Sequence, residues 1–214
     1  GASTGIYEAL ELRDNDRARF KGKGVLTAVN NINNIIKPAL LKQNFNIVNQ
    51  KEIDEYLVHE LDQSKNEWGF NKSNLGANSI LAVSVCVARA GAAQRNIFLN
   101  EYISEISGLK HHSTTLPIPF LNVINGGEHA GNQLAFQEFM LVPSGFDSFR
   151  EALKAGCEVY QTLKGIIKQK YGAEGTCVGD EGGFAPNISN EREVLEMITK
   201  AINDAGYANK VKIA

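Results

Sequence analysis

Cysteine, long apolar runs and charge of one sign are all scarce in this sequence. Its three cysteines, Cys86, Cys157 and Cys177, are widely separated and form no CxxC pair. This spacing favours neither a disulfide framework nor a zinc site, and we expect reduced thiols in or near the core. No segment reaches the roughly 18 apolar residues that a membrane-spanning helix needs, and no charged-then-apolar leader opens the chain. We therefore expect a soluble, cytoplasmic protein.

Charge is nearly balanced along the chain. The 214 residues include 22 Lys and Arg and 24 Asp and Glu, which gives a formal net charge of −2. Neither this total nor any local run of Lys and Arg provides the basic surface that binds a nucleic-acid backbone. We expect no nucleic-acid partner.

The first half of the chain has the pattern of a helical structure. Apolar residues recur with helical spacing in four segments, residues 25–36, 51–61, 76–93 and 99–106. Pro38 is expected to end the first of these helices. The third has small residues on nearly every side and a single charge, Arg89, so we expect it to be buried on most sides.

The second half has a mixed pattern. Strands are predicted at residues 116–124, 137–142 and 210–214, and helices at residues 149–171 and 190–205. Asn190 and Glu193 form the pattern of a capping box for the last helix, and Gly206 is expected to end it. The order strand, strand, helix, helix, strand indicates an α/β fold and is typical of the beginning of an α/β barrel.

Two glycine-rich loops carry groups that could bind a ligand. The opening loop, Gly1–Gly5, could close over a ligand or present a hydroxyl and a carbonyl group to a metal; an exposed turn is the alternative. His129 lies in the loop Asn125–Asn132, where its imidazole could titrate near neutral pH or donate a hydrogen bond to an anion. A solvated loop histidine is the alternative for this residue.

Two carboxylates lie close to predicted strand ends. Glu138 begins an apolar strand, where a charge needs a partner, either a ligand or metal-bound water, or a structural Lys or Arg. Asp180 and Glu181 lie between glycines, which favours a turn that aims one side chain, although a turn-capping role is equally open. Two carboxylates and His129 together make a plausible acid–base set.

In order along the chain, the motifs resemble those of the enolase family. The matching stretches are GASTGIYEALELRD at residues 1–14, LGANSILAVS at 75–84, LPIPFLNVINGG at 116–127, HAGN at 129–132, QEFM at 137–140 and VGDEGGFAPNI at 178–188. The resemblance implies the mainly helical part of an α+β N-terminal capping domain at residues 1–113, incomplete at its start. It also implies the first strands and helices of an enolase-type α/β barrel at residues 114–214.

The resemblance further implies an activity and a set of catalytic residues. The expected reaction is the glycolytic, reversible dehydration of 2-phosphoglycerate to phosphoenolpyruvate by a cytoplasmic homodimer, with two Mg²⁺ ions in each active site. In the family a lysine takes the C2 proton and a glutamate assists departure of the C3 hydroxyl. By motif, that glutamate is Glu181, and Glu138 is the second carboxylate near the same hydroxyl.

Other roles follow from the same resemblance. His129 is expected to contact substrate from a mobile lid, Gln137 and Ala2 to contribute to the substrate pocket, and Ser3 to ligate the second metal ion. The sequence departs from the family at Glu128, where a serine is usual, and a negative charge there would disfavour a phosphate-bearing anion unless it points to solvent.

The implied Mg²⁺ carboxylate ligands, the base lysine and a phosphate-binding arginine would lie beyond Ala214. We therefore expect the 214-residue chain by itself to be inactive and poorly stable. Two alternatives remain open at this point. One is another member of the wider superfamily, such as a racemase or sugar-acid dehydratase. The other is a catalytically inactive enolase fragment with a binding or scaffold role.

Overall fold

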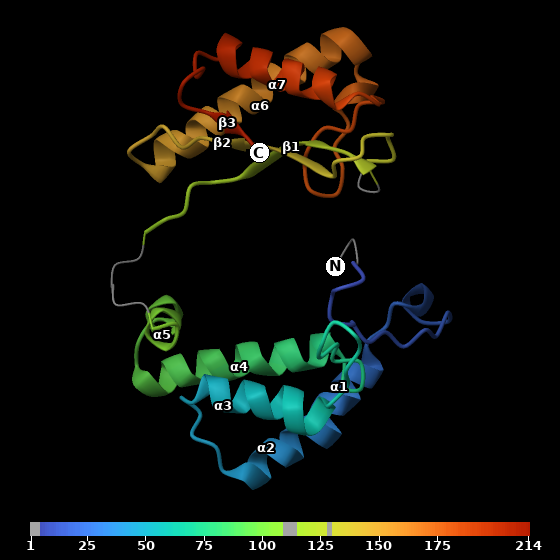
Figure 1. The fold of residues 1–214 in the computed structure, drawn as a ribbon, viewed down its shortest axis with the longest axis vertical. Coiled ribbons are helices and arrows are strands. Elements are labelled where there is room, and N and C mark those ends of the chain that lie inside the picture. Colours follow the sequence, from blue (N-terminus) through green and yellow to red (C-terminus); the bar gives the residue numbers. More distant parts are fainter. Residues whose placement is uncertain (1–4, 109–114, 128–129) are drawn as a thin grey trace. The chain divides into compact units, whose positions relative to one another are not determined.

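Residues 5–108, 115–127 and 130–214 are described by the structure, a computed structural model (Figure 1). They divide into a helical unit, residues 5–108, and a sheet unit, residues 115–127 and 130–214. Each unit has its own hydrophobic core. The predicted domain boundary between residues 113 and 114 falls outside the described residues and stays a prediction.

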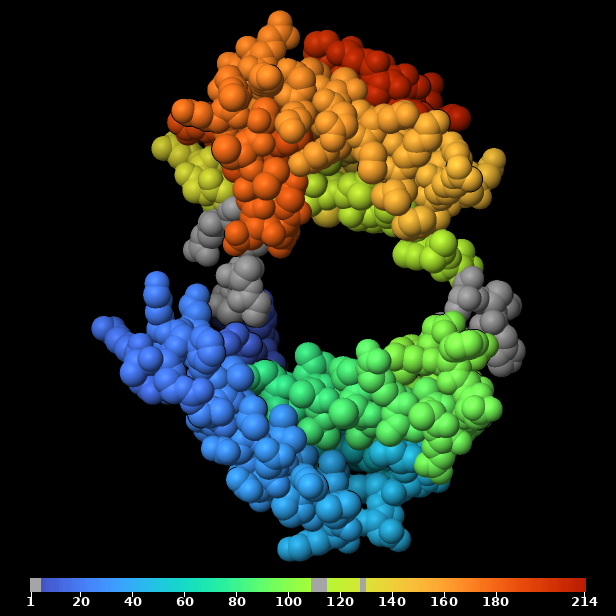
Figure 2. Space-filling view, turned by 180° about the vertical axis from the view of Figure 1, so that it is seen from behind, coloured from blue at the N-terminus to red at the C-terminus, as the bar shows by residue number. Residues whose placement is uncertain are grey.

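The helical unit begins with an irregular segment and a short 3₁₀ turn, η1 (Phe20–Gly22). Its helices are α1 (Leu26–Asn31), η2 (Ile32–Ile36), α2 (Lys37–Gln43), α3 (Gln50–Glu55), η3 (Tyr56–Asp62), α4 (Ala77–Arg95) and α5 (Leu99–Ile106). The buried core residues are Ile36, Ile53, Leu57, Leu75, Ile80 and Val87. Figure 2 shows α4, in green, beside the blue and cyan helices that share this core.

The prediction that Pro38 ends the first helix is wrong. The chain stays helical from Leu26 to Gln43, because η2 is a π-helical turn and Pro38 then stands in the first turn of α2. A proline inside a helix lacks one backbone hydrogen bond and crowds the carbonyl of the preceding turn, and the wider π-helical turn before Pro38 leaves room for its ring. The helix ends instead at Asn44, whose φ of 54° is left-handed.

Helix α4 is less buried than its composition predicts. One side packs on the unit, with Ile80 and Val87 buried, but the exposed fraction of Leu81 is 64% and that of Val85 is 45%. A close helix crossing explains one of its small residues: a Cβ on Gly91 would lie 2.6 Å from the hydroxyl oxygen of Tyr102 in α5. Gly91 thus permits a tight contact with α5, and α4 is not buried on every side.

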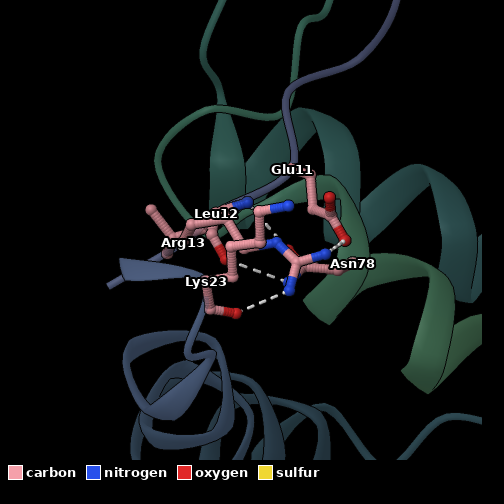
Figure 3. A network of polar contacts seen from close by, with 5 residues as sticks. All are labelled: Glu11, Leu12, Arg13, Lys23 and Asn78. Atoms are coloured by element: carbon pink, nitrogen blue, oxygen red, sulfur yellow. Dashed lines mark hydrogen bonds and ion pairs between the residues drawn. The ribbon is translucent and has the colours of Figure 1, made fainter. Parts of the chain in front are cut away.

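A polar network attaches the irregular segment to the start of α4 (Figure 3). The Leu12 N–H donates to Asn78 Oδ1 at 3.0 Å, and Asn78 Nδ2 donates to the Leu12 carbonyl at 3.1 Å. The Arg13 guanidinium donates to the Lys23 carbonyl at 2.7 Å and to the Glu11 carboxylate at 2.8 Å. These bonds hold the backbone on both sides of the η1 turn.

The sheet unit is a three-stranded sheet with helices on one side. Its elements are β1 (Leu121–Asn125), β2 (Glu138–Val142), α6 (Phe149–Tyr171), η5 (Glu174–Thr176), α7 (Glu191–Asp204) and β3 (Lys212–Ile213). The strand order is β1-β2-β3, and both pairings are antiparallel. Helices α6 and α7, orange and red in Figures 1 and 2, lie side by side over one face of the sheet.

The two faces of the sheet differ in burial. Phe139 and Leu141 of β2 are buried in the core beneath α6 and α7, whereas Glu138 and Met140 alternate with them and are half-buried. Alternate residues of a strand point to opposite faces. Glu138 and Met140 therefore lie on the face away from the helices, which we call the open face.

Register places two asparagines of β1 on the open face as well. Asn122 is paired with Met140 and Asn125 with Glu138, and a bulge between Asn122 and Ile124 adds one residue to β1. Residues directly opposite in an antiparallel pair share a face. Asn122 and Asn125 would lie on opposite faces of a regular strand, and the bulge brings them to the same one.

The last helix is capped only partly as predicted. The Asn190 side chain accepts a hydrogen bond from the Arg192 N–H at 3.0 Å, which confirms it as the N-cap. Glu193 instead bonds to the Tyr171 hydroxyl and to Lys170 Nζ of α6. The second half of the predicted capping box is therefore replaced by a contact between helices.

The described cysteines are free, as expected, but each is exposed within its own unit, so none of them lies inside a core. Cys86 lies on the poorly covered side of α4, and Cys157 borders a cleft beside α6. Within the described residues, no helix is both long and apolar enough to span a membrane.

Candidate active site

The loop that carries Asp180 and Glu181 is closed by its own backbone. The Gly179 N–H donates to the Gly183 carbonyl at 2.8 Å, and the Gly182 N–H donates to the Gly179 carbonyl at 3.1 Å. Gly182 has a φ of +83°, a conformation that side chains disfavour. The glycines therefore form the turn that the sequence predicts, with the two carboxylates at its tip.

The base of this loop is attached to β1. The Phe184 N–H donates to the Val123 carbonyl and the Asn125 N–H donates to the Phe184 carbonyl, both at 2.9 Å. The Phe184 side chain is buried in the core of the sheet unit. The loop, which we call the Glu181 loop (Gly179–Phe184), is thus held along the edge of the first strand.

A side-chain contact brings Glu181 to the open face. Asn122 Nδ2 donates to Glu181 Oε2 at 3.1 Å, although the two residues are 59 positions apart. Asn122 lies across from Met140 on the face that also bears Glu138. The Glu181 carboxylate is therefore bonded to a strand side chain on the face that bears Glu138.

Gln137 and Glu138 lie at the beginning of β2, beside the loop that follows β1. The Gly126 N–H donates to the Gln137 carbonyl at 2.8 Å, and both side chains are half-buried. Partial burial reduces the screening of the Glu138 charge by solvent, but the carboxylate keeps contact with water. Such a carboxylate remains accessible to a ligand on the open face.

Three predicted site residues, Ala2, Ser3 and His129, lie outside the described residues, as does Glu128. Their predicted roles are unchanged. Among the described residues, no group of three or more His, Cys, Asp or Glu side chains could hold a metal ion. Two carboxylates suit Mg²⁺, which prefers oxygen ligands in near-octahedral geometry, but they supply only part of such a site.

Sequence reasoning missed the two asparagines of β1. The amide atoms Asn125 Oδ1, Asn125 Nδ2 and Asn122 Oδ1 are buried and have no hydrogen-bond partner among the described residues. A Cβ on Gly183 would lie 2.3 Å from Asn125 Oδ1 and 3.0 Å from Asn122 Oδ1. Gly183 thus allows the loop to approach these amides. The available signal was the presence of two asparagines in an otherwise apolar strand.

Tyr160 of α6 is a second residue that the sequence did not single out. Its hydroxyl donates to the Gly182 carbonyl at 2.8 Å, and its ring stacks on Phe184 with centroids 4.3 Å apart and planes 14° apart. Burial raises the pKa of the Tyr160 hydroxyl above its usual value, so it remains a donor at neutral pH. Tyr160 thereby contacts the Glu181 loop at two points.

A cleft of about 410 Å³ lies between β1, α6 and the Glu181 loop. Asn122, Tyr160 and Glu181 border it together with Cys157 and apolar side chains at the start of β1. A carboxylate at the edge of a partly apolar cleft is a suitable group for proton transfer to a bound ligand. Fold and site together define a carboxylate-bearing cleft at the edge of a sheet that two helices cover.

Comparisons with known proteins agree with this class. Residues 1–103 match the family model described as enolase, N-terminal domain, and residues 113–214 match the model described as enolase, C-terminal TIM barrel domain. The chain is 54% identical over 213 residues to the enolase of Eimeria tenella and 56% identical over 213 residues to that of Solanum lycopersicum. The alignments cover 100% of this chain and 47% of each relative.

This chain belongs to the enolase family, as its motifs indicate. The α/β fold class expected from the sequence is confirmed by the two matching family models. The chain spans about half the length of the curated relatives that it matches.

Proposed function

We propose that the whole protein containing this chain is a glycolytic lyase that catalyses the reversible dehydration of 2-phosphoglycerate to phosphoenolpyruvate. Membership of the enolase family supports this proposal. The observation that carries it is the 3.1 Å contact from Asn122 Nδ2 to Glu181 Oε2, because it bonds the loop carboxylate to a strand side chain on the face that bears Glu138. Dehydration needs such paired proton-handling groups around one leaving hydroxyl.

Glu181 is the group that assists departure of the C3 hydroxyl in this proposal. Hydroxide is a poor leaving group, so a carboxylic acid that gives it a proton can accelerate the step by about 10²- to 10⁴-fold. Glu138 acts near the same hydroxyl and shares the handling of its proton. In the hydration direction the two groups take up the proton that water releases.

Mg²⁺ is the proposed cofactor, with two ions in each active site, and when bound it would stabilise the negative charge that develops on the substrate carboxylate and enolate. Ser3 would contribute one ligand through its hydroxyl group. His129, Gln137 and Ala2 would contact the substrate. The whole protein would act in the cytoplasm as a homodimer without a nucleic-acid partner.

The test is a turnover assay on the whole protein. We would follow phosphoenolpyruvate by its absorbance with and without Mg²⁺, for the wild type and for Glu181→Gln and Glu138→Gln. Each substitution keeps the side-chain shape but removes the titrating group, so kcat should fall by about 10²- to 10⁴-fold. Glu196→Gln, on the exposed side of α7, is the matched control and should keep wild-type turnover.

Two results would contradict the proposal. A wild-type protein of correct mass that forms no phosphoenolpyruvate with Mg²⁺ would exclude the reaction. Full activity of Glu181→Gln would be compatible with the proposed reaction but would show that Glu181 is not needed for it.

A further inference from the structure

The Glu181 loop cannot orient its own carboxylate. Its backbone hydrogen bonds hold the turn but do not select a rotamer for Glu181, whose side chain is exposed. A glutamate in such a setting samples several rotamers unless tertiary contacts select one. Two contacts to the tip of this loop come from distant elements, β1 and α6.

We propose that Asn122 and Tyr160 are positioning residues that together hold the Glu181 carboxylate in one orientation over the open face. The proposal rests on the proposed function, because it assigns how the catalytic carboxylate of that reaction is aimed. Asn122 acts on the carboxylate itself, and Tyr160 acts on the backbone of the adjacent residue.

Asn122 can make this contact in one amide orientation only. With Nδ2 towards Glu181, the amide donates to a carboxylate oxygen at 3.1 Å, and Oδ1 is buried on the side of Gly183. The reverse orientation would place Oδ1 against a carboxylate oxygen, and two acceptors repel each other. Because Asn122 belongs to a paired strand, the position of the backbone that carries its side chain is fixed.

Tyr160 restrains the loop from the helix side. Its hydroxyl bonds to the carbonyl of Gly182, the residue directly after Glu181, and its ring covers the buried ring of Phe184. Helix α6 is 23 residues long. Its residues Val159 and Leu163, close to Tyr160 in the sequence, are buried in the core of the sheet unit. The position of the loop tip is therefore tied to a rigid element.

The proposal has a kinetic signature. A misplacement of about 1 Å in a reacting group can lower the rate by about 10²-fold even where substrate binding is intact. Asn122→Asp keeps the shape of the side chain but replaces the donor with a charge that repels Glu181, so kcat should fall by about 10- to 100-fold. Tyr160→Phe removes one neutral hydrogen bond, so its kcat should fall by about 3- to 10-fold. KM should change less than kcat in both variants.

Matched controls separate positioning from stability. Tyr171→Phe removes a hydroxyl that bonds to Glu193 between α6 and α7, away from the Glu181 loop. Asn209→Asp makes the same charge change as Asn122→Asp at an exposed turn. Both controls should keep wild-type kcat. If Tyr171→Phe lowers kcat as much as Tyr160→Phe, or if both Asn122→Asp and Tyr160→Phe keep wild-type kcat, the proposal is overturned.

A second measurement does not depend on activity. In the whole protein labelled with ¹⁵N at asparagine, the side-chain amide protons of Asn122 should exchange with solvent more slowly than those of Asn209. Glu181→Ala should remove this protection. Rapid exchange at Asn122 in the wild type overturns the positioning proposal, even where Glu181→Gln abolishes turnover. Protected exchange in a wild-type protein without turnover supports the contact and refutes the proposed reaction instead.

Discussion

Replacement of Gly183 by alanine tests how closely the Glu181 loop approaches β1. The new Cβ would lie 2.3 Å from Asn125 Oδ1, well inside the 3.0 Å below which real Cβ contacts essentially do not occur. Asn125 is fully buried, and its backbone nitrogen would also be only 3.0 Å from the new Cβ, so the strand has little room to yield. The loop must therefore move by most of an ångström.

The expected magnitude follows from that displacement. Insertion of a methyl group into a well-packed site costs about 1–3 kcal/mol of unfolding free energy. Glu181 is two residues away on the same short loop, so its carboxylate should be misplaced, and kcat should fall by about 10²-fold. Unfolding in urea, followed by circular dichroism, would measure the first effect, and the turnover assay on the whole protein would measure the second.

Two other glycines serve as controls. A Cβ on Gly165, in the interior of α6, would meet nothing within 4 Å, so Gly165→Ala should stabilise the protein by about 0.5–1 kcal/mol. Gly182→Ala is equally free of clashes, but the φ of +83° at Gly182 should cost about 1–2 kcal/mol. The reasoning is refuted if Gly183→Ala is as stable and as active as the wild type.

Three further outcomes are expected. The Asp14 carboxylate accepts hydrogen bonds from the Thr27 and Leu26 N–H groups, and these bonds lower its pKa. The contribution of Asp14 to stability is therefore present above about pH 4, and it is lost as the pH falls through the lowered pKa. Asp14→Asn should therefore flatten the acid side of a plot of urea midpoint against pH. Burial and the neighbouring Glu193 carboxylate raise the pKa of Tyr171 to about 12. The protonated hydroxyl therefore contributes its full stabilisation below about pH 10, and this stabilisation is lost as the pH rises towards 12. An ultraviolet titration should lose a tyrosine transition near pH 12 in Tyr171→Phe. Finally, the 214-residue chain expressed alone, with its mass checked, should form no phosphoenolpyruvate under conditions in which the whole protein does, and Mg²⁺-dependent turnover of the isolated chain would contradict the expectation drawn from its motifs.

Several helices were predictable because their signals are local. The predicted bounds of α5 and α6 coincide with those observed, residues 99–106 and 149–171. For α6, Ser148 caps the first turn and Gly172 follows the last, so both ends depend on neighbouring residues alone. The end at Pro38 was mispredicted because a π-helical turn before the proline, which no local pattern indicated, lets the helix continue through it.

The carboxylates of the candidate site were found in the sequence, but their neighbours were not. Glu138 and Glu181 are conspicuous because a charge begins an apolar strand and another lies between glycines. Asn122 is marked in the sequence only as an asparagine in an apolar strand, and Tyr160 has no unusual context. Their contacts to the Glu181 loop join residues 59 and 22 positions apart. Such contacts arise from packing, which sequence spacing does not express.

By itself, the sequence determined the helices with local caps, the turn around Glu181 and the family to which the chain belongs. Only the tertiary structure decided that Asn122 shares a face of the sheet with Glu138 and bonds to Glu181. The physical reason is register: a period of two would put Asn122 and Asn125 on opposite faces, and the bulge in β1 adds the residue that brings both to the side of Glu138. The docking of Phe184 on β1 then carries Glu181 to the same side.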